Sequence, residues 1–237
     1  MQNPKQAGVD YFNREHWLAS IQSQISIGAR RRMFNAWIKY AGPVSTLSIL
    51  DLGATPDREL ADSNCMIPWF QSTGAKVSMY SPENISVLSD VFPGVTVLPS
   101  RAFGEAVPAE NKSYDWVTSS AVLEHTGNTE KQIAFIAESA RLAKTGLFLT
   151  TPNRWHWLEF HTKLPLLHWL PRGTHRKVLR TLGQSLWAQE SHLRLIGRGE
   201  LMSIAAKALG PKWTFEVRAV WTLGMPSNLV LLAKPKN

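Results

Sequence analysis

Short apolar runs alternate with helix-like stretches along most of the chain, and this alternation restricts the fold more than any other feature of the sequence. The first run, residues 47–53, stays largely apolar until Asp51 and then ends in Gly53, which is typical of a buried parallel strand. The later strand-like and helix-like stretches are residues 76–80, 83–92, 95–98, 114–119, 129–143 and 145–150. Strands separated by helices favour a parallel α/β sheet with right-handed crossovers.

The last part of the chain departs from this alternation. A helical pattern over residues 199–209 is followed by strand-like runs at residues 213–222 and 228–233, which only a few residues connect. A connection that short joins antiparallel neighbours. We therefore predict a single domain over residues 1–237, in which a helical region at residues 11–41 precedes a mostly parallel sheet that ends in an antiparallel hairpin.

Composition limits the compartment and the class of protein. The chain has 237 residues, 44% of them hydrophobic, and a single cysteine, so it can build a core but no internal disulfide. The first ten residues are polar and include Pro4. No apolar run approaches the roughly 18 residues that a spanning helix needs. We expect a soluble, cytoplasmic protein.

A basic and aromatic segment separates the strand at residues 145–150 from the helix at residues 199–209. Residues 154–198 hold eight basic residues against two acidic ones, five of the seven histidines and four of the ten tryptophans. Such a segment is too long for an ordinary loop. We predict that residues 152–198 form a helical cap whose aromatic side chains line a pocket.

The basic groups of the cap admit two interpretations. They either face an anionic acceptor or the inner face of an anionic membrane, where several of them would hold the protein reversibly, or they only solubilise the chain. In the second interpretation the aromatic side chains pack on the sheet or on a second subunit.

Two motifs resemble those of class I S-adenosylmethionine-dependent methyltransferases. In residues 49–57 a strand ends in an acid and a glycine turn, and in residues 114–125 an aromatic-Asp pair precedes a strand that Val-Leu-Glu-His follows. The resemblance implies a Rossmann-like class I methyltransferase fold, with S-adenosyl-L-methionine as cofactor and S-adenosyl-L-homocysteine as product. The first motif departs from the family because Ala54 and Thr55 stand where further glycines are usual.

Several shorter runs are similar to one bacterial subgroup that resembles the type-11 methyltransferases. These runs are residues 51–57, 61–64, 151–155, 159–162 and 164–171. The subgroup often goes with the assembly of cell-surface polysaccharide or glycolipid. The resemblance therefore implies methyl transfer to a small-molecule, sugar or glycolipid acceptor, with oxygen as the expected atom.

The resemblance also implies where the cofactor lies, beyond the carboxyl ends of the strands. Asp51 and Gly53 would lie under its methionine end. The family's ribose-binding acid is missing at the end of the second strand, which leaves Glu83 as the nearest substitute and Asp57 as its rival. The expected cofactor-binding residues are Asp51, Gly53, Ala54, Thr55, Asp57, Glu83, Ala102, Ser119 and Ser120.

Methyl transfer to a hydroxyl requires positioning and the removal of a proton, for which histidine is suited. The catalytic candidates are His125, at the cofactor-facing turn, and His161, which the Glu159 carboxylate can orient; His156 and His168 are further candidates. Spacing by two residues places Glu159 and His161 on one face only in an extended segment. No Cys/His cluster has ligand spacing, so we expect no metal site.

Two other functions remain open. A net charge of +8 and the run Arg30-Arg31-Arg32 suggest an RNA methyltransferase. We expect that run to lie on a solvated helix face, and no RNA-binding module accompanies it, so a nucleic-acid partner is not expected. The other alternative is a catalytically silent methyltransferase-like protein that binds a partner. Titration with the cofactor separates the silent protein from both enzymes, and salt-sensitive RNA binding separates the two enzymes.

Overall fold

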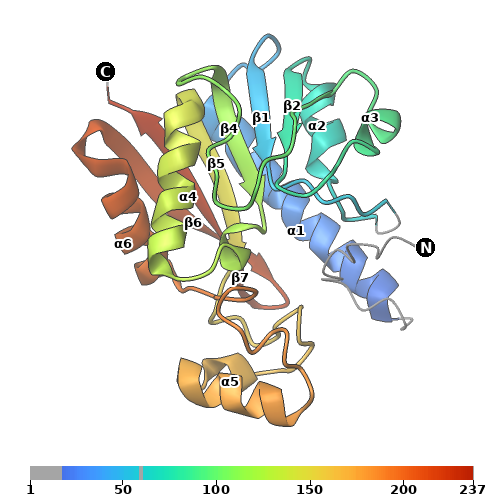
Figure 1. The fold of residues 1–237 in the computed structure, drawn as a ribbon, viewed down its shortest axis with the longest axis vertical. Coiled ribbons are helices and arrows are strands. Elements are labelled where there is room, and N and C mark those ends of the chain that lie inside the picture. Colours follow the sequence, from blue (N-terminus) through green and yellow to red (C-terminus); the bar gives the residue numbers. More distant parts are fainter. Residues whose placement is uncertain (1–17, 59–60, 237) are drawn as a thin grey trace.

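The computed structural model describes residues 18–58 and 61–236, and in this part of the chain seven strands form one sheet of order β3-β2-β1-β4-β5-β7-β6 (Figure 1). The strands are β1 Ser48–Leu52, β2 Lys76–Tyr80, β3 Thr96–Val97, β4 Tyr114–Ser120, β5 Ala143–Pro152, β6 Trp213–Thr222 and β7 Met225–Pro235. Strands β1 to β5 pair in parallel, whereas β7 is antiparallel to both β5 and β6. The predicted mostly parallel sheet with an antiparallel hairpin is confirmed.

Helices cover both faces of this sheet (Figure 1). Helices α1 and α2 pack on one face, and α4 and α6 pack on the other. The α-helices are α1 Leu18–Ala41, α2 Met66–Ser72, α3 Leu88–Val91, α4 Thr129–Leu142, α5 Arg172–Thr181 and α6 Arg198–Leu209. Short 3-10 helices are η1 Leu123–His125, η2 Leu167–Trp169 and η3 Gly210–Lys212. Of the helical region predicted at residues 11–41, residues 11–17 lie outside the described part.

Two helices differ from the sequence prediction. The helix expected over residues 83–92 is reduced to α3, because Asn84 Oδ1 accepts the Ser86 N–H (3.0 Å) and Ser81 Oγ accepts the Glu83 N–H (3.3 Å). Such local side-chain bonds compete with a helix for the same backbone donors. Helix α2 was not predicted. Its sequence contains Pro68, but this proline lies in the first turn of the helix, where proline is tolerated.

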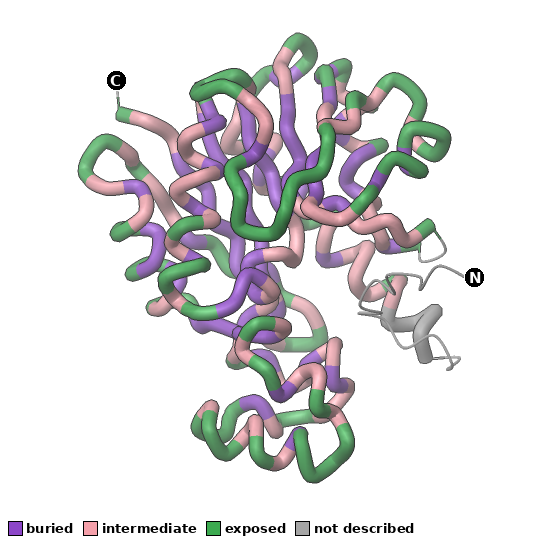
Figure 2. The backbone as a smooth tube through the Cα atoms, in the orientation of Figure 1, coloured by how far each residue is buried: buried purple, intermediate pink, exposed green. Residues whose placement is uncertain are grey.

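One fully buried tryptophan organises the face covered by α1 and α2. Trp37 of α1 makes edge-on contacts with Phe70 of α2 (ring centroids 5.1 Å apart) and with Trp116 of β4 (5.7 Å). It also stacks on Phe148 of β5 at 6.0 Å. Aromatic pairs in these geometries add about 0.5–1.5 kcal/mol each beyond burial. The cluster fixes α1 against the middle of the sheet. The backbone of the sheet is buried along much of its length (Figure 2).

The starts of β1 and β4 are joined by a carboxylate. Asp115 Oδ2 accepts both the backbone N–H (2.9 Å) and the hydroxyl (2.8 Å) of Ser48, and Ser48 Oγ accepts the Asp115 N–H (3.0 Å). These bonds fix the pairing of the two strands, in which Asp51 lies opposite Thr118. The carboxyl ends of β1 and β4 therefore open at the same edge of the sheet.

Residues 153–197 extend beyond this carboxyl edge and contain η2 and α5 (Figure 1). A bridge between Asn153 and Ile196 closes the base of the segment. Its side chains bond to its own backbone: the carbonyl of His156 accepts from Trp169 Nε1 (3.2 Å) and meets His168 Nε2 at 2.7 Å. That residues 152–198 act as a cap stays a prediction.

We expect the substitution Trp37→Ala to destabilise the protein strongly, because it leaves a cavity between α1, α2 and the sheet. Truncating a buried tryptophan costs about 3–5 kcal/mol. For a chain of this size that lowers the melting temperature by about 6–20 °C. Thermal unfolding followed by circular dichroism measures the shift. Trp221→Ala is the control, since that side chain is 61% exposed and should change the melting temperature by about 1–2 °C at most.

Candidate functional site

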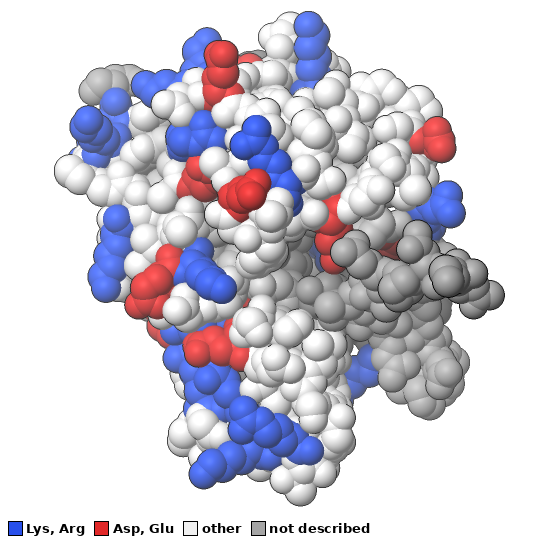
Figure 3. Space-filling model, viewed as in Figure 1, with Lys and Arg blue, Asp and Glu red and all other residues white. Residues whose placement is uncertain are grey.

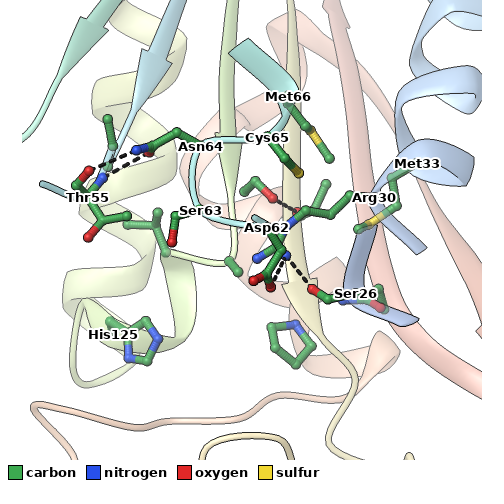
Figure 4. Close-up of a pocket in the computed structure, with 18 of the residues that line it drawn as sticks. Ser26, Arg30, Met33, Thr55, Asp62, Ser63, Asn64, Cys65, Met66 and His125 are labelled. Atoms are coloured by element: carbon green, nitrogen blue, oxygen red, sulfur yellow. Dashed lines mark hydrogen bonds and ion pairs between the residues drawn. The ribbon is translucent and has the colours of Figure 1, made fainter. Parts of the chain in front are cut away.

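A cavity of about 300 Å³ opens at the carboxyl edge of the sheet (Figure 4). Its walls come from α1, the turns after β1, β2 and β4, the end of β5, the β6–β7 hairpin and residues 160–161. The predicted site residues that line it are Asp51, Gly53, Ala54, Thr55, Glu83, Ser120, His125 and His161. Among the described residues, four predicted ones lie outside the lining: Asp57, Ala102, Ser119 and Glu159.

The turn after β1 is built around Gly53, whose φ of +90° favours glycine. A Cβ added there would lie 2.3 Å from Val122 Cγ2, so the turn after β1 approaches the turn after β4 too closely for any side chain. The turn is also held by Asn64, which accepts the Thr55 N–H (3.0 Å) and donates to the Thr55 carbonyl (2.8 Å), as Figure 4 shows. This part of the cavity is therefore fixed by the packing of Gly53 against the Val122 side chain and by the hydrogen bonds of the Asn64 side chain.

Asp51 supplies a buried carboxyl group at the end of β1. Burial raises its pKa to about 7, although the Thr118 hydroxyl donates to Oδ1 at 2.8 Å and partly opposes that shift. A carboxylate in such a place gains most from a cationic partner, since burial without one costs free energy.

Three of the residues outside the lining have other partners or neighbours. The Ser119 hydroxyl donates to the Leu52 carbonyl at 2.7 Å and is buried between β4 and β1, so this side chain does not line the cavity. Asp57 accepts a hydrogen bond from Ser63 Oγ at 2.6 Å. In place of Ala102, the adjacent Phe103 lines the cavity. The alternation of side chains along β4 explains why Ser120 lines the cavity when Ser119 does not.

An ion pair in the cavity was missed by the sequence analysis. Arg30 Nη1 lies 2.8 Å from Asp62 Oδ2 and also bonds Ser26 Oγ (Figure 4). Ser23 Oγ donates to Asp62 Oδ1 at 2.9 Å. The expectation of a solvated arginine run is therefore wrong for Arg30. The signal was the spacing of Ser26, Arg30 and Met33, which lie on one face of α1.

The other two arginines of the run also contact the protein. The Arg31 guanidinium lies 4.1 Å from the centre of the Trp69 ring, and Arg32 donates to the Thr222 hydroxyl at 2.8 Å. Both residues are exposed, as predicted.

Two imidazoles meet at the far corner of the cavity. The rings of His125 and His161 lie edge to face, with their centroids 4.9 Å apart. The ring of Trp187 packs against that of His161, with the two ring centroids 5.1 Å apart. Glu159 Oε1 contacts His161 Nδ1 at 2.5 Å and accepts its backbone N–H at 2.8 Å, while Oε2 accepts the Thr162 N–H at 2.6 Å. The sequence prediction required an extended segment for this pairing, whereas the structure brings Glu159 and His161 together in a tight turn.

Partners decide how burial changes the pKa of each group in this corner. Burial lowers the pKa of His125 to about 3 and raises that of Glu124 to about 7. Burial opposes the charged forms of Glu159 and His161 too, but their mutual attraction outweighs it, so the pKa of Glu159 falls to about 2 and that of His161 rises. His125 is a weak proton acceptor at neutral pH, whereas Glu159 and His161 form an ion pair.

The fold is shared with solved structures. Magnesium protoporphyrin IX methyltransferase from Synechocystis PCC 6803 matches 95% of this chain and 90% of its own, at 18% identity and a TM-score of 0.57. The chain has the class I methyltransferase fold. The 1,6-didemethyltoxoflavin-N1-methyltransferase of Burkholderia thailandensis shares this methyltransferase fold. The match covers 95% of this chain and 92% of the Burkholderia chain, at 14% identity and a TM-score of 0.56.

Other comparisons add less about activity. A Rhodobacter sphaeroides protein described as a zinc-dependent alcohol dehydrogenase matches 87% of this chain and 90% of its own, at 11% identity and a TM-score of 0.61. No family model matches the chain, and no curated protein matches its sequence. At such identities the likeness establishes the methyltransferase fold, and function has to be argued from the site.

The close approach at Gly53 generates a prediction. Gly53→Ala adds a methyl group against Val122 and strains a left-handed backbone, so we expect it to cost about 2–4 kcal/mol. Gly224→Ala is the matched control, because Gly224 also has a positive φ (+79°) but no atom within 4 Å of an added Cβ. Thermal unfolding should show a clearly larger loss for Gly53→Ala. Equal losses would mean that backbone strain alone explains the glycine.

Proposed function

We propose that the chain is an S-adenosylmethionine-dependent methyltransferase whose cofactor binds in the cavity at the carboxyl edge of the sheet. The observation that carries this proposal is the buried Asp51 carboxyl group beside the Gly53 turn, at the edge where parallel sheets bind ligands. S-adenosylmethionine carries an ammonium group and a sulfonium, which suit a buried acid. The cavity volume is at the lower end of the range for small-molecule sites.

The lining supports an orientation for the cofactor. With its ammonium group at Asp51 and its methionine chain over the Gly53 turn, its ribose would point toward the turn after β2. Glu83 lines that part of the cavity, and burial raises its pKa. A carboxylate there can accept both ribose hydroxyls, and Glu83 lines the cavity where its rival Asp57 does not.

The acceptor would then enter from the corner with His125, His161 and Phe160, which lines the same cavity. We propose a hydroxyl of a small molecule, with a sugar or glycolipid as the acceptor class that the sequence resemblance implies. Glu159 is a positioning residue, because it holds His161 through its ring and its backbone. An RNA acceptor has less support, since Arg30 turns into the cavity and pairs with Asp62.

Calorimetric titration with S-adenosylmethionine and S-adenosylhomocysteine tests the cofactor site. The pKa of Asp51 is raised to about 7, so the ligand-free carboxyl group is protonated below that pH and ionised above it. An ammonium ligand needs the ionised form. We therefore expect affinity to rise by up to about tenfold per pH unit below pH 7 and to level off above it.

The variant Asp51→Asn should bind both ligands at least about tenfold more weakly at pH 8, which corresponds to about 1.4 kcal/mol, and its affinity should no longer rise with pH. Asp57→Asn is the matched control and should bind as the wild type does. A folded Asp51→Asn variant with wild-type affinity, or a wild type that binds neither ligand, would contradict the proposal.

Residues 153–197 support a second part of the proposal, reversible contact with an anionic membrane surface. Basic side chains gather over α5 (Figure 3), and exposed apolar side chains lie in the same segment: Trp155, Leu166, Trp169, Leu170 and Leu182. No helix among the described residues is both long and apolar enough to cross a membrane. Of the aromatic side chains that were predicted to line a pocket, Phe160 lines the cavity, whereas the tryptophans of this segment do not.

The ion pairs reduce the number of basic groups available to a membrane. Arg172 binds Glu200 at 2.7 Å, and Arg176 binds Glu190 at 3.1 Å. Lys177 and Arg180 are exposed and have no ion pair within the described part of the chain. These two residues are therefore the ones to change.

Sedimentation with vesicles that contain anionic lipid tests this contact. Each basic residue near such a surface contributes about 1 kcal/mol, so Lys177→Ala with Arg180→Ala should weaken binding about 30-fold at low salt. The control pair Lys207→Ala with Lys212→Ala removes the same charge from α6 and η3, and should weaken binding much less. If the wild type does not sediment with these vesicles at low salt, the membrane part of the proposal fails.

A further inference from the structure

We propose that Glu124, His125 and His161 bind a divalent metal ion of the zinc type in the wall of the cavity. One ligand atom from each of the three residues lies within 4.8 Å of the other two. Two imidazoles and one carboxylate are a common ligand set for zinc when further coordination positions stay open. The sequence analysis expected no metal, because His161 is far in the chain from Glu124 and His125 and no ligand spacing joins them.

The strongest observation is a buried carboxylate oxygen. Glu124 is fully buried; its Oε2 accepts the Thr151 hydroxyl at 2.9 Å, while no described residue donates a hydrogen bond to its Oε1. That oxygen lies 3.8 Å from His125 Nε2. Buried acceptors are normally satisfied, and an unpartnered one is costly. A cation between Oε1 and the imidazoles would remove that cost.

The imidazoles are held as metal-ligating histidines usually are. His125 Nδ1 lies 2.6 Å from the His192 carbonyl oxygen, and His161 Nδ1 lies 2.5 Å from Glu159 Oε1. An acceptor at Nδ1 keeps a proton on that nitrogen, so Nε2 is the nitrogen that binds an ion, after it has released any proton of its own to water. The backbone of Glu124 is fixed as well, because its carbonyl accepts the Arg194 N–H at 2.7 Å.

The dimensions of the cluster suit an ion after a small adjustment. A tetrahedral zinc ion with bonds of about 2.1 Å holds its donor atoms roughly 3.4 Å apart. Side-chain rotations that move the three donors by about an ångström would therefore close them around the ion. His125 and His161 line the cavity and Glu124 lies behind them, so the remaining positions of the ion would face the cavity.

Ion binding does not depend on methyl transfer, whereas the role of the ion does rest on the proposed function. A zinc-type ion lowers the pKa of a hydroxyl that coordinates it. An acceptor hydroxyl bound there would release its proton to water in the open cavity, so the step would need no histidine base. The Glu159 carboxylate would then act through His161, as the partner that orients a ligand.

The test uses the full chain, freed of metal with a chelator and titrated with Co²⁺ and Zn²⁺. We expect one Co²⁺ per chain, with visible absorption of an ion bound by nitrogen and oxygen, and its displacement by Zn²⁺. Glu124→Gln, which keeps the shape of the side chain, and His161→Ala should each weaken binding at least about 100-fold. Glu159→Gln should weaken binding about 10- to 100-fold, as removal of an outer partner does.

Two controls make the result specific. His192→Ala keeps the backbone carbonyl that holds His125 and should bind metal as the wild type does. Asp51→Asn should also keep metal binding, so failure of the cofactor site and failure of the metal site are distinguishable. If Glu124→Gln does not fold, His161→Ala at the cavity wall still gives the answer. A wild type that binds no Co²⁺ at about 1 mM, or wild-type affinity in folded Glu124→Gln and His161→Ala, overturns the proposal.

Discussion

The contact of Trp37 with Phe70, Trp116 and Phe148 is the interaction on which the cavity depends most. It sets both the position of α1 on the sheet and the rotation of that helix about its own axis. Arg30 lies two turns earlier on α1, at the cavity. Because a helix transmits rotation along its length, the packing of one aromatic side chain also determines where Arg30 meets Asp62.

The carboxyl edge of the sheet shows how partners, more than burial, decide the charge of an acid. Asp51, Glu124 and Glu159 are all buried. Glu159 receives two backbone N–H groups and an imidazole, and its pKa falls, whereas Asp51 and Glu124 each receive one hydroxyl and their pKa values rise. The two acids with fewer donors are those that would gain most from a cation, either an ammonium group or a metal ion.

The sequence predicted the sheet well because strands and short connections leave a local signal. The run before Asp51 and the short connection between β6 and β7 were sufficient for the parallel strands and the hairpin. The predicted part of the cavity wall follows β1, β2 and β4, at Asp51, Gly53, Ala54, Thr55, Glu83, Ser120 and His125, and it also includes His161. The contact of His161 with His125 depends on how residues 153–197 fold back, and the burial of Glu124 depends on Thr151 and the backbone of Arg194. No local periodicity encodes such contacts.

The position of β7 has a consequence for the order of assembly. Leu147 to Leu149 of β5 pair with Leu231 to Ala233 of β7, yet residues 153–224 are synthesised between the two strands. Until β7 has been synthesised, the edge of β5 that will later pair with β7 therefore carries apolar residues and unpaired backbone groups. Exposed strand edges of that kind invite pairing with other chains. The ribosome-bound intermediate, rather than the finished protein, is thus the stage at which this fold is most vulnerable to aggregation.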